Sequence, residues 1–140
     1  MPLPLISVIM PAHNAAATIG AAINGIVAQT HKNWELIIID AASVDNTAAI
    51  VKTYQQDDKR IRYYRNKKNS KQWAARNRGL SLARGTYIAW QDADDISAPT
   101  RLMTQLRLLL AARGRTQLVS TDMVIINDDG QMQNRLHSYS

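Results

Sequence analysis

Three acidic residues fall within four positions of YIAWQDADDISAP, the segment from Tyr87 to Pro99. Asp92, Asp94 and Asp95 come directly after a strand-like run, and carboxylates this close repel one another unless a cation lies between them. Mg²⁺ and Mn²⁺ prefer such oxygen ligands, often together with phosphate oxygens and water. In an extended segment Asp92 and Asp94 point the same way across the small Ala93. We therefore predict a metal site here; the alternative is a solvated turn before a helix.

Polar residues also follow two other apolar runs. Pro11, Ala12, His13 and Asn14 come after the first run, and Asp40 closes WELIIID. A buried carboxylate is costly unless it is hydrogen-bonded, so Asp40 is predicted either to contact a base or ribose or to cap the next loop. His13 is expected to contact a base or to be an exposed loop residue. Asn14 is predicted to cap a helix, with nearby backbone N–H groups left for a ligand.

Basic residues mark the segment NSKQWAARNRGL. Lys71 is predicted in the first turn of a helix, where the helix dipole disfavours a cation, which indicates an anionic ligand nearby. Arg76 is a second candidate, because its guanidinium fork matches phosphate geometry. Arg78 is expected either to contact the anionic ligand or to lie on a solvated helix face, and Trp73 to be a core or interface residue.

The composition limits the class of protein. The 140 residues suit a single domain spanning 1–140, and 46% of them are hydrophobic, enough to form a core. The net charge of +6 favours an anionic partner such as a nucleotide or a phospholipid surface. No RNA-binding signature is present, so nucleic acid is not expected. The absence of cysteine excludes disulfides and thiolate metal sites and fits a reducing compartment such as the cytoplasm. No signal peptide and no apolar run of about 20 residues is evident.

Strand-like and helix-like segments alternate along the chain. Strands are predicted at 5–10, 34–39, 61–65, 85–91 and 117–126, and helices at 15–29, 45–55, 71–83 and 100–112. This alternation predicts an α/β fold, a three-layer α/β/α arrangement around a mostly parallel sheet. Ligands bind beyond the carboxyl ends of such strands, so the polar residues named above are expected to converge. Asp128, Asp129 and Gly130 predict a turn, and the polar tail from Gln131 has no assigned partner.

Two long segments, SVIMPAHNAAATIGAAINGIVAQTHKNWELIIIDAASVDNT and AARNRGLSLARGTYIAWQDADDISAPTRLMTQ, resemble the family 2 glycosyltransferases, from about Ile6 to Ile126. The resemblance implies the GT-A fold and transfer of a sugar from a nucleotide-diphosphate donor to an acceptor hydroxyl, usually with inversion. It implies that 11–14 lie against the base, that Asp40 contacts the base, and that Arg76 helps to hold the nucleotide. It also implies that the D-x-D block binds ribose and Mn²⁺ or Mg²⁺, with Asp94 and Asp95 nearest.

The sequence departs from the family pattern in three ways. The family often has DDGS where this chain has DAAS, with Ala41 and Ala42, and His13 replaces the usual aromatic residue. Family members also run well beyond this length, and their catalytic base and acceptor site lie in the C-terminal half. The resemblance therefore implies that the chain corresponds to a donor-binding half, and no residue can be named as the base. The alternative function is a nucleotide-binding module that needs a partner or the missing half.

The resemblance also sets the partners that we expect. These are a nucleotide-sugar donor, with a UDP-sugar first among the candidates, and a saccharide or lipid-linked acceptor in polysaccharide biosynthesis. A basic surface suits peripheral contact with the inner face of the membrane. Apolar surface left by the missing half predicts self-association. A dinucleotide-binding domain is excluded because no G-x-G-x-x-G follows the first strand, and a phosphoacceptor domain would need paired acids where this chain has PAHN.

Overall fold

The computed structural model describes residues 2–136, which form two compact units that divide after Pro99. That the chain is a single domain stays a prediction. The first unit holds every predicted site residue, and the second holds one helix and a hairpin.

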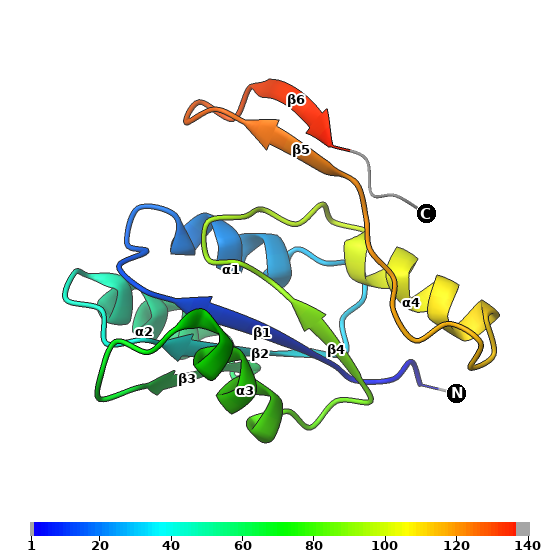
Figure 1. The fold of residues 1–140 in the computed structure, drawn as a ribbon, viewed down its shortest axis with the longest axis horizontal. Helices are drawn as coiled ribbons and strands as arrows, with labels where there is room; N and C mark the ends of the chain where they lie inside the picture. The colour runs from blue at the N-terminus through cyan, green and yellow to red at the C-terminus, as the bar shows by residue number, and fades with distance from the viewer. Residues whose placement is uncertain (1, 137–140) are drawn as a thin grey trace. The chain divides into compact units, whose positions relative to one another are not determined.

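A parallel sheet of four strands is the centre of the first unit (Figure 1). The strands β1 (Ile6–Ala12), β2 (Trp34–Asp40), β3 (Ile61–Arg65) and β4 (Tyr87–Trp90) lie in the order β3-β2-β1-β4. Every residue of the two central strands is buried, which explains why their sequences are nearly continuous apolar runs. The predicted α/β fold with a mostly parallel sheet is confirmed.

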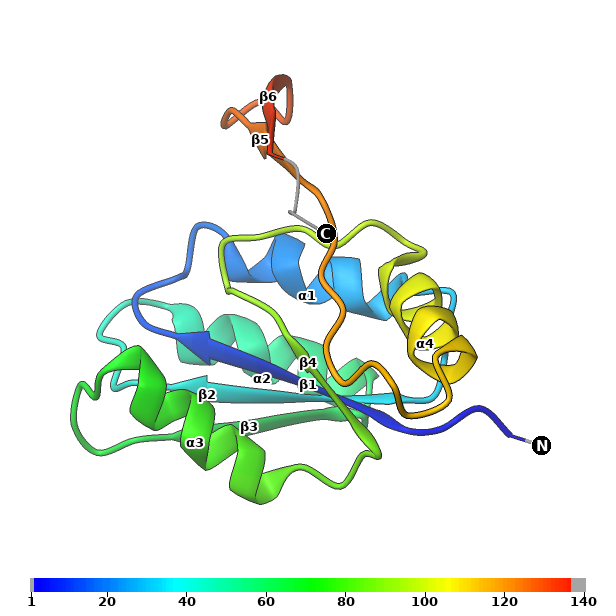
Figure 2. The same cartoon turned by 45° about the vertical axis from the view of Figure 1, so that its right-hand side comes forward.

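Helices cover both faces of this sheet. Helices α1 (Ile19–Val27) and α2 (Thr47–Asp57) lie on one face, and α3 (Gln72–Leu82) lies on the other (Figures 1 and 2). The chain moves outward through β1, β2 and β3, and α3 then carries it back to β4 on the far side of β1. Because parallel crossovers are right-handed, this reversal places α3 on the opposite face. It also makes the gap between β1 and β4 the point where the strand order changes direction.

Pro11 lies inside β1, although the sequence predicted that it would end the strand. The Ile9 carbonyl accepts a hydrogen bond from the Gln91 N–H (3.0 Å) towards β4, and the Ala12 carbonyl accepts one from the Ala41 N–H (2.8 Å) on the β2 side. The backbone N–H and C=O groups of odd-numbered residues in β1 therefore point towards β4. The pairing of β4 with β1 ends at Ile9. Pro11 lacks its N–H at a position where no neighbouring strand needs it.

The second unit corrects the expectation for the fifth strand. Helix α4 (Arg101–Ala111) is followed by β5 (Met123–Ile126) and β6 (Met132–Leu136), which form a separate antiparallel hairpin. The predicted turn is confirmed, because the Asn127 carbonyl accepts the Gly130 N–H at 2.9 Å and Gly130 has a φ of 78°. So short a turn returns the chain beside β5, which makes 132–136 its partner and not a polar tail. Residues 137–140 lie outside the described residues.

Gly79 sets how closely α3 approaches the sheet. A Cβ atom at this position would lie 2.4 Å from Cγ2 of Ile9, which is fully buried in β1. Gly79 and Ala75 are the buried residues of α3, one helical turn apart. Two small residues therefore let the middle of α3 pack closely onto the central strands.

Gly79→Ala is expected to destabilise the protein by about 1–3 kcal/mol, because the added methyl overlaps Ile9 in a packed core. Asn77→Ala, at an exposed position of the same helix, is the control and should change stability by about 0.5 kcal/mol or less. Urea unfolding measures both. A gain on Gly79→Ala, as helix propensity alone would give, would contradict this close packing.

A buried carboxylate joins the strands at their amino ends. Glu35 accepts hydrogen bonds from the Ser7 hydroxyl (2.6 Å), the Arg84 backbone N–H (2.7 Å) and the Arg62 guanidinium (2.7 Å). Burial alone would raise the pKa of Glu35, but these three donors outweigh it and hold that pKa below its ordinary value of 4.5. The network fastens β1, β2, β3 and the loop before β4 at the edge opposite the polar strand ends.

Because the pKa of Glu35 is lower in the folded than in the unfolded chain, its ionised form adds stability above about pH 4.5. That contribution is lost as the pH falls through the folded-state pKa. Glu35→Gln should cost about 3 kcal/mol at pH 7 and flatten the loss of stability below pH 4.5. Urea unfolding from pH 7 to pH 3 measures this, with Asp57→Asn at an exposed position as the control. Parallel wild-type and Glu35→Gln curves below pH 4.5 would contradict it.

Candidate functional site

An open hollow of about 310 Å³ lies at the carboxyl ends of β1 and β4, where the strand order reverses. Ligands of open α/β sheets bind at this point. Three segments far apart in the sequence form it: the end of β1 with the following loop, the start of α3, and the loop after β4. The lining residues are Pro11, His13, Asn14, Ala15, Thr18, Gln72, Asp92, Ala93 and Asp94.

The acid cluster is held by a turn and not by an extended segment. The Asp95 N–H donates to the Asp92 carbonyl at 3.2 Å, so the alternation that the sequence analysis used for Asp92 and Asp94 is wrong. The turn nevertheless brings carboxylate oxygens of Asp92, Asp94 and Asp95 within 4.8 Å of one another. Ala93 is buried beneath them, while Asp94 and Asp95 are exposed. Three oxygen donors this close suit a hard divalent cation.

Gln91 shapes this turn, and the sequence analysis did not single it out. Its buried side-chain amide donates to the Asp92 carbonyl (3.1 Å) and the Asp95 carbonyl (2.8 Å). Its oxygen accepts the Ser97 hydroxyl at 2.5 Å. A buried amide needs such partners. A glutamine at the end of an apolar run, just before an acid cluster, was therefore the sequence feature that could have predicted this role. Gln91 therefore fixes the backbone that carries all three acids.

Helix α3 presents a cation to the cluster. Arg76 forms an ion pair with Asp92 at 3.1 Å, and Gln72 reaches the same carboxylate oxygen at 3.5 Å. The Arg76 guanidinium also lies 5.5 Å from the centre of the Trp90 ring. Its buried Nε atom has no hydrogen-bond partner among the described residues. Arg76 thus stands at the acid cluster with donor capacity left for an anionic ligand.

Asp40 lies at the end of β2, and its carboxylate is fully buried. One oxygen accepts the Ser43 N–H (2.8 Å) and hydroxyl (2.6 Å), and the other accepts Tyr63 Oη (2.5 Å) and Arg65 (3.3 Å). These contacts match the loop-capping alternative. Four donors of the protein thus surround the Asp40 carboxylate. The predicted contact between Asp40 and a base stays a prediction.

Asn14 is not the N-cap of α1, as the sequence predicted. The helix begins at Ile19, with Thr18 as N-cap, and Asn14 has a left-handed φ of 46°. Its side-chain oxygen accepts the Val44 N–H at 2.9 Å, and its own N–H donates to Ser43 Oγ at 2.9 Å. The N–H groups expected to remain open for a ligand are thus engaged, those of Ala15 and Ala16 by Thr47 and Asp45.

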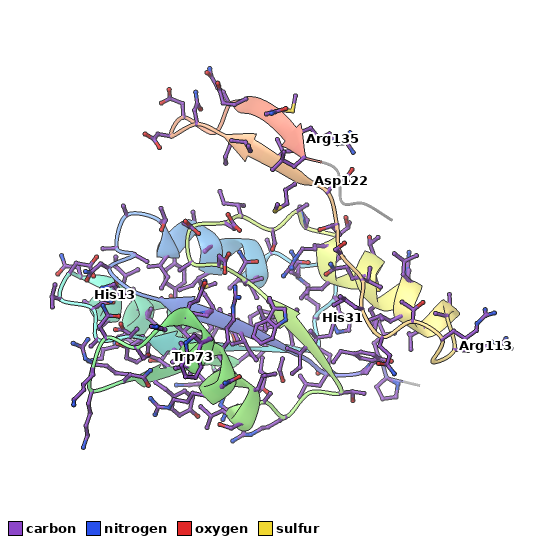
Figure 3. All side chains as sticks on the ribbon, in the orientation of Figure 1. His13, His31, Trp73, Arg113, Asp122 and Arg135 are labelled. Carbon is purple, nitrogen blue, oxygen red and sulfur yellow. The ribbon has the colours of Figure 1, made fainter. Side chains whose placement is uncertain are left out.

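His13, which is labelled in Figure 3, contacts Asn14 of the same network. Its Nδ1 lies 2.8 Å from the Ala41 carbonyl, which can only accept, so Nδ1 carries the proton. The other nitrogen, Nε2, then accepts from the side-chain amides of Asn14 (3.3 Å) and Asn69 (3.4 Å). His13 is exposed and lines the hollow, and its contact with a base stays a prediction.

The departure DAAS has a local conformational effect. Ala42 adopts a left-handed φ of 58°, a region that glycine enters without a steric penalty and that disfavours a Cβ. This is the position where the resembling family often has glycine. Ala42 is therefore held in a strained conformation by the hydrogen bonds that Asp40 makes with Ser43.

The remaining predicted residues lie around the hollow or away from it. Lys71 is the N-cap of α3 and is exposed beside Gln72, but it does not line the hollow. Trp73 is 63% exposed, so the expectation of a core residue is wrong. Arg78 donates to the Arg65 carbonyl (3.2 Å) and to the Asn66 side chain.

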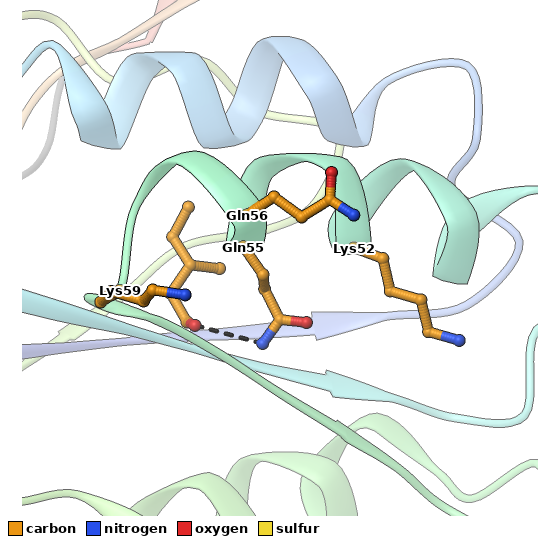
Figure 4. A pocket seen from close by; sticks show the side chains of 5 residues that line it. Lys52, Gln55, Gln56 and Lys59 are labelled. Atoms are coloured by element: carbon orange, nitrogen blue, oxygen red, sulfur yellow. Dashed lines mark hydrogen bonds between the residues drawn. The ribbon is translucent and has the colours of Figure 1, made fainter.

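A second hollow, of about 400 Å³, lies on α2 and is lined by Lys52, Gln55, Gln56, Lys59 and Ile61 (Figure 4). The Gln55 amide donates to the Ile61 carbonyl there at 3.2 Å. The lining contains neither the acids nor a strand-end polar group. The smaller hollow at the acid cluster is therefore the stronger candidate site.

Known proteins resemble the chain over most of its length. It matches the family described as Glycosyl transferase family 2 over residues 7–137. EpsE of Bacillus subtilis (strain 168), which carries a glycosyltransferase name, is 42% identical over 128 residues, covering 91% of this chain and 46% of EpsE. The Escherichia coli UDP-Glc:alpha-D-GlcNAc-diphosphoundecaprenol beta-1,3-glucosyltransferase WfgD is 40% identical over 106 residues, covering 76% of this chain and 41% of WfgD. The chain thus spans less than half the length of these relatives.

Two solved structures share the fold. TarS 1–349 of S. aureus in complex with UDP has a TM-score of 0.72 at 21% identity and covers 90% of this chain and 43% of that one. The mannosyltransferase PcManGT of Pyrobaculum calidifontis, in complex with GDP-Man and Mn²⁺, has a TM-score of 0.72 at 21% identity, covering 89% of this chain and 36% of that one.

Because Asp40 holds the loops of the site, we expect substitution of Tyr63 to lower the free energy of unfolding more than substitution of Tyr64. Burial, and then the hydrogen bond to Asp40, raise the pKa of Tyr63 to about 12, so its hydroxyl stays a donor at all ordinary pH values. Tyr63→Phe should cost about 1.5–3 kcal/mol, because a fully buried carboxylate loses a donor. Tyr64→Phe, whose hydroxyl accepts from Arg62 at 2.8 Å, should cost about 0.5–1.5 kcal/mol. Urea unfolding compares them, and an equal or larger loss on Tyr64→Phe would contradict this role of Asp40.

Proposed function

Because the chain belongs to glycosyl transferase family 2, we propose that it binds a nucleotide-diphosphate sugar at the acid cluster and forms the donor side of a metal-dependent, inverting glycosyltransferase. The observation that carries this proposal is the meeting of three carboxylates with Arg76 at the switch point of a parallel sheet. The UDP and GDP-Man complexes of proteins with the same fold support a nucleotide-sugar ligand.

The residues present fit a divalent cation. Asp94 and Asp95 are exposed at the hollow's edge with oxygens near those of Asp92, and no cysteine or histidine belongs to the cluster. An all-oxygen donor set of this size suits Mn²⁺ or Mg²⁺, which would complete their coordination with diphosphate oxygens and water. The Mn²⁺ complex of PcManGT supports this choice. When bound, the cation neutralises charge on the leaving nucleoside diphosphate.

The other residues would bind and orient the donor. Pro11, His13 and Asn14 line the hollow and would meet a base, as would Ala12 between them and Asp40, which pairs with Ala12 across the sheet. Arg76 and Lys71 would contact the diphosphate, and Asp92 the ribose. In the transfer itself, an acceptor hydroxyl oxygen bonds to the anomeric carbon while the bond from that carbon to the phosphate oxygen breaks. The electron pair leaves with the nucleoside diphosphate, and the hydroxyl proton passes to a base that this chain's residues do not identify.

The acceptor is proposed to be a saccharide or a lipid-linked sugar. WfgD, named for a diphosphoundecaprenol-linked acceptor, supports the lipid-linked class. Such an acceptor would place the protein at the cytoplasmic face of a membrane. Among the described residues no helix is long and apolar enough to cross a bilayer. Self-association stays a prediction.

The second candidate function is a nucleotide-binding module that does not turn over alone. It is favoured by the length of the chain relative to its relatives. Both functions predict donor binding, and they differ only in sugar transfer to an added acceptor.

Calorimetric titration of UDP, with GDP, dTDP and CDP as comparators, tests the donor site. We expect one nucleotide to bind in the presence of Mn²⁺, and Asp94→Asn to weaken that binding at least about tenfold through loss of a ligand charge. Asp57→Asn removes the same charge at an exposed position of α2 and should bind as the wild type does.

Equal affinity with and without Mn²⁺ would contradict the metal assignment. Failure of every nucleotide to bind the folded wild type would overturn the proposal. Equal effects of the two substitutions would contradict the role of Asp94.

A further inference from the structure

Residues 59–84 carry ten basic residues and no acidic one. This segment spans the edge strand β3, the loop that follows it and helix α3. Four of the ten pair with acids elsewhere in the chain, namely Arg60, Arg62, Arg65 and Arg76. The other six have no acidic partner among residues 2–136: Lys59, Lys67, Lys68, Lys71, Arg78 and Arg84. The excess positive charge of the chain is therefore concentrated here.

Exposed apolar side chains accompany this charge on α3. Trp73 is 63% exposed and Leu80 is 41% exposed. They lie seven residues apart, two turns along the same side of the helix, opposite the buried Ala75 and Gly79. Trp73 lies in the first turn of α3 (Figure 3), five residues after the exposed Lys68. An exposed tryptophan a few residues after lysines is a combination that favours the interface between water and lipid.

We propose that Lys67, Lys68 and the exposed side of α3 at Trp73 and Leu80 form a docking surface for a bilayer that contains acidic phospholipids. The lysines meet the negative headgroups, and Trp73 and Leu80 enter the headgroup region, where apolar area adds to the electrostatic attraction. Nucleic acid is the weaker partner, because the sequence has no RNA-binding signature and the Arg62 and Arg78 guanidinium groups already lie 5.5 and 5.6 Å from the centre of the Tyr64 ring.

The surface adjoins the candidate site. Asn69, in the same loop as the lysines, contacts His13 at 3.4 Å, and Gln72 contacts Asp92 at 3.5 Å. Docking would bring the carboxyl edge of the sheet to the membrane, where a lipid-linked acceptor would lie. That consequence rests on the proposed function, whereas the membrane contact itself does not.

Vesicle flotation of the 140-residue chain without nucleotide tests the contact. We expect binding to phosphatidylcholine vesicles that contain 30% phosphatidylglycerol (about one acidic lipid in three), weakening as salt screens the charges. Lys67→Gln/Lys68→Gln should bind about 30-fold more weakly, and Trp73→Ser about tenfold. Lys52→Gln/Lys59→Gln is the matched control: it removes the same charge from α2 and the turn that follows it, around the second hollow and outside the docking surface, and should stay within about twofold of wild type.

Circular dichroism would establish that each variant folds, and tryptophan emission should shift to the blue with acidic vesicles in wild type but not in Trp73→Ser. An equal loss in both lysine double variants, or no loss in either, would overturn the proposal. Displacement of the vesicles by polyuridylate at equal phosphate concentration would assign the surface to nucleic acid instead. Because Lys67 and Lys68 do not line the hollow, UDP titration of the double variant separates this outcome from a failure of the donor site.

Discussion

The arrangement of the candidate site depends on one buried carboxylate at the end of β2. Asp40 is inaccessible to solvent and is stable there only because four donors surround it. Ser43 carries the connection onward, since its hydroxyl donates to Asp40 and accepts the N–H of Asn14. Tyr63 and Arg65 bring in β3. The loops after β1 and β2 and the end of β3 are thus joined through one side chain, and these contacts hold the left-handed conformations of Asn14 and Ala42.

Charged side chains are arranged differently at the two ends of the sheet. At the amino ends, Glu35 is matched by Arg62 and by two further donors, so the network is closed and structural. At the carboxyl ends, oxygens of Asp92, Asp94 and Asp95 lie within 4.8 Å of one another, Asp92 pairs with Arg76, and Asp94 and Asp95 are exposed. Gln91 fixes the backbone of that turn through two carbonyls without contributing charge. A fixed turn that gathers three carboxylates is an arrangement that a divalent cation would stabilise.

Several sequence-based expectations were wrong because a tertiary contact outweighed a local preference. Asn14 has the residue type of a helix cap, but the Val44 N–H bonds its side chain, and α1 begins five residues later. Pro11 usually ends a strand, but β4 is too short to need its N–H. The segment 123–126 has the composition of a buried strand, yet all four residues are exposed, because the nearest available partner was the strand just beyond a tight turn. For Asn14 and Pro11 the partner that decides the conformation is far away in the sequence, so a local pattern could not predict it.

The sequence by itself determined the α/β class, the four parallel strands and three helices of the first unit within a few residues, and the polar groups that follow the strands. These features depend on apolar periodicity and on the common direction of parallel strands, both of which are local. Only the tertiary structure decided which donors surround Asp40, that Gln91 holds the acid turn, and that Trp73 is exposed on α3. Those outcomes depend on which segments lie side by side once α3 has crossed the sheet, because a hydrogen bond or a buried contact needs its partner within a few ångströms.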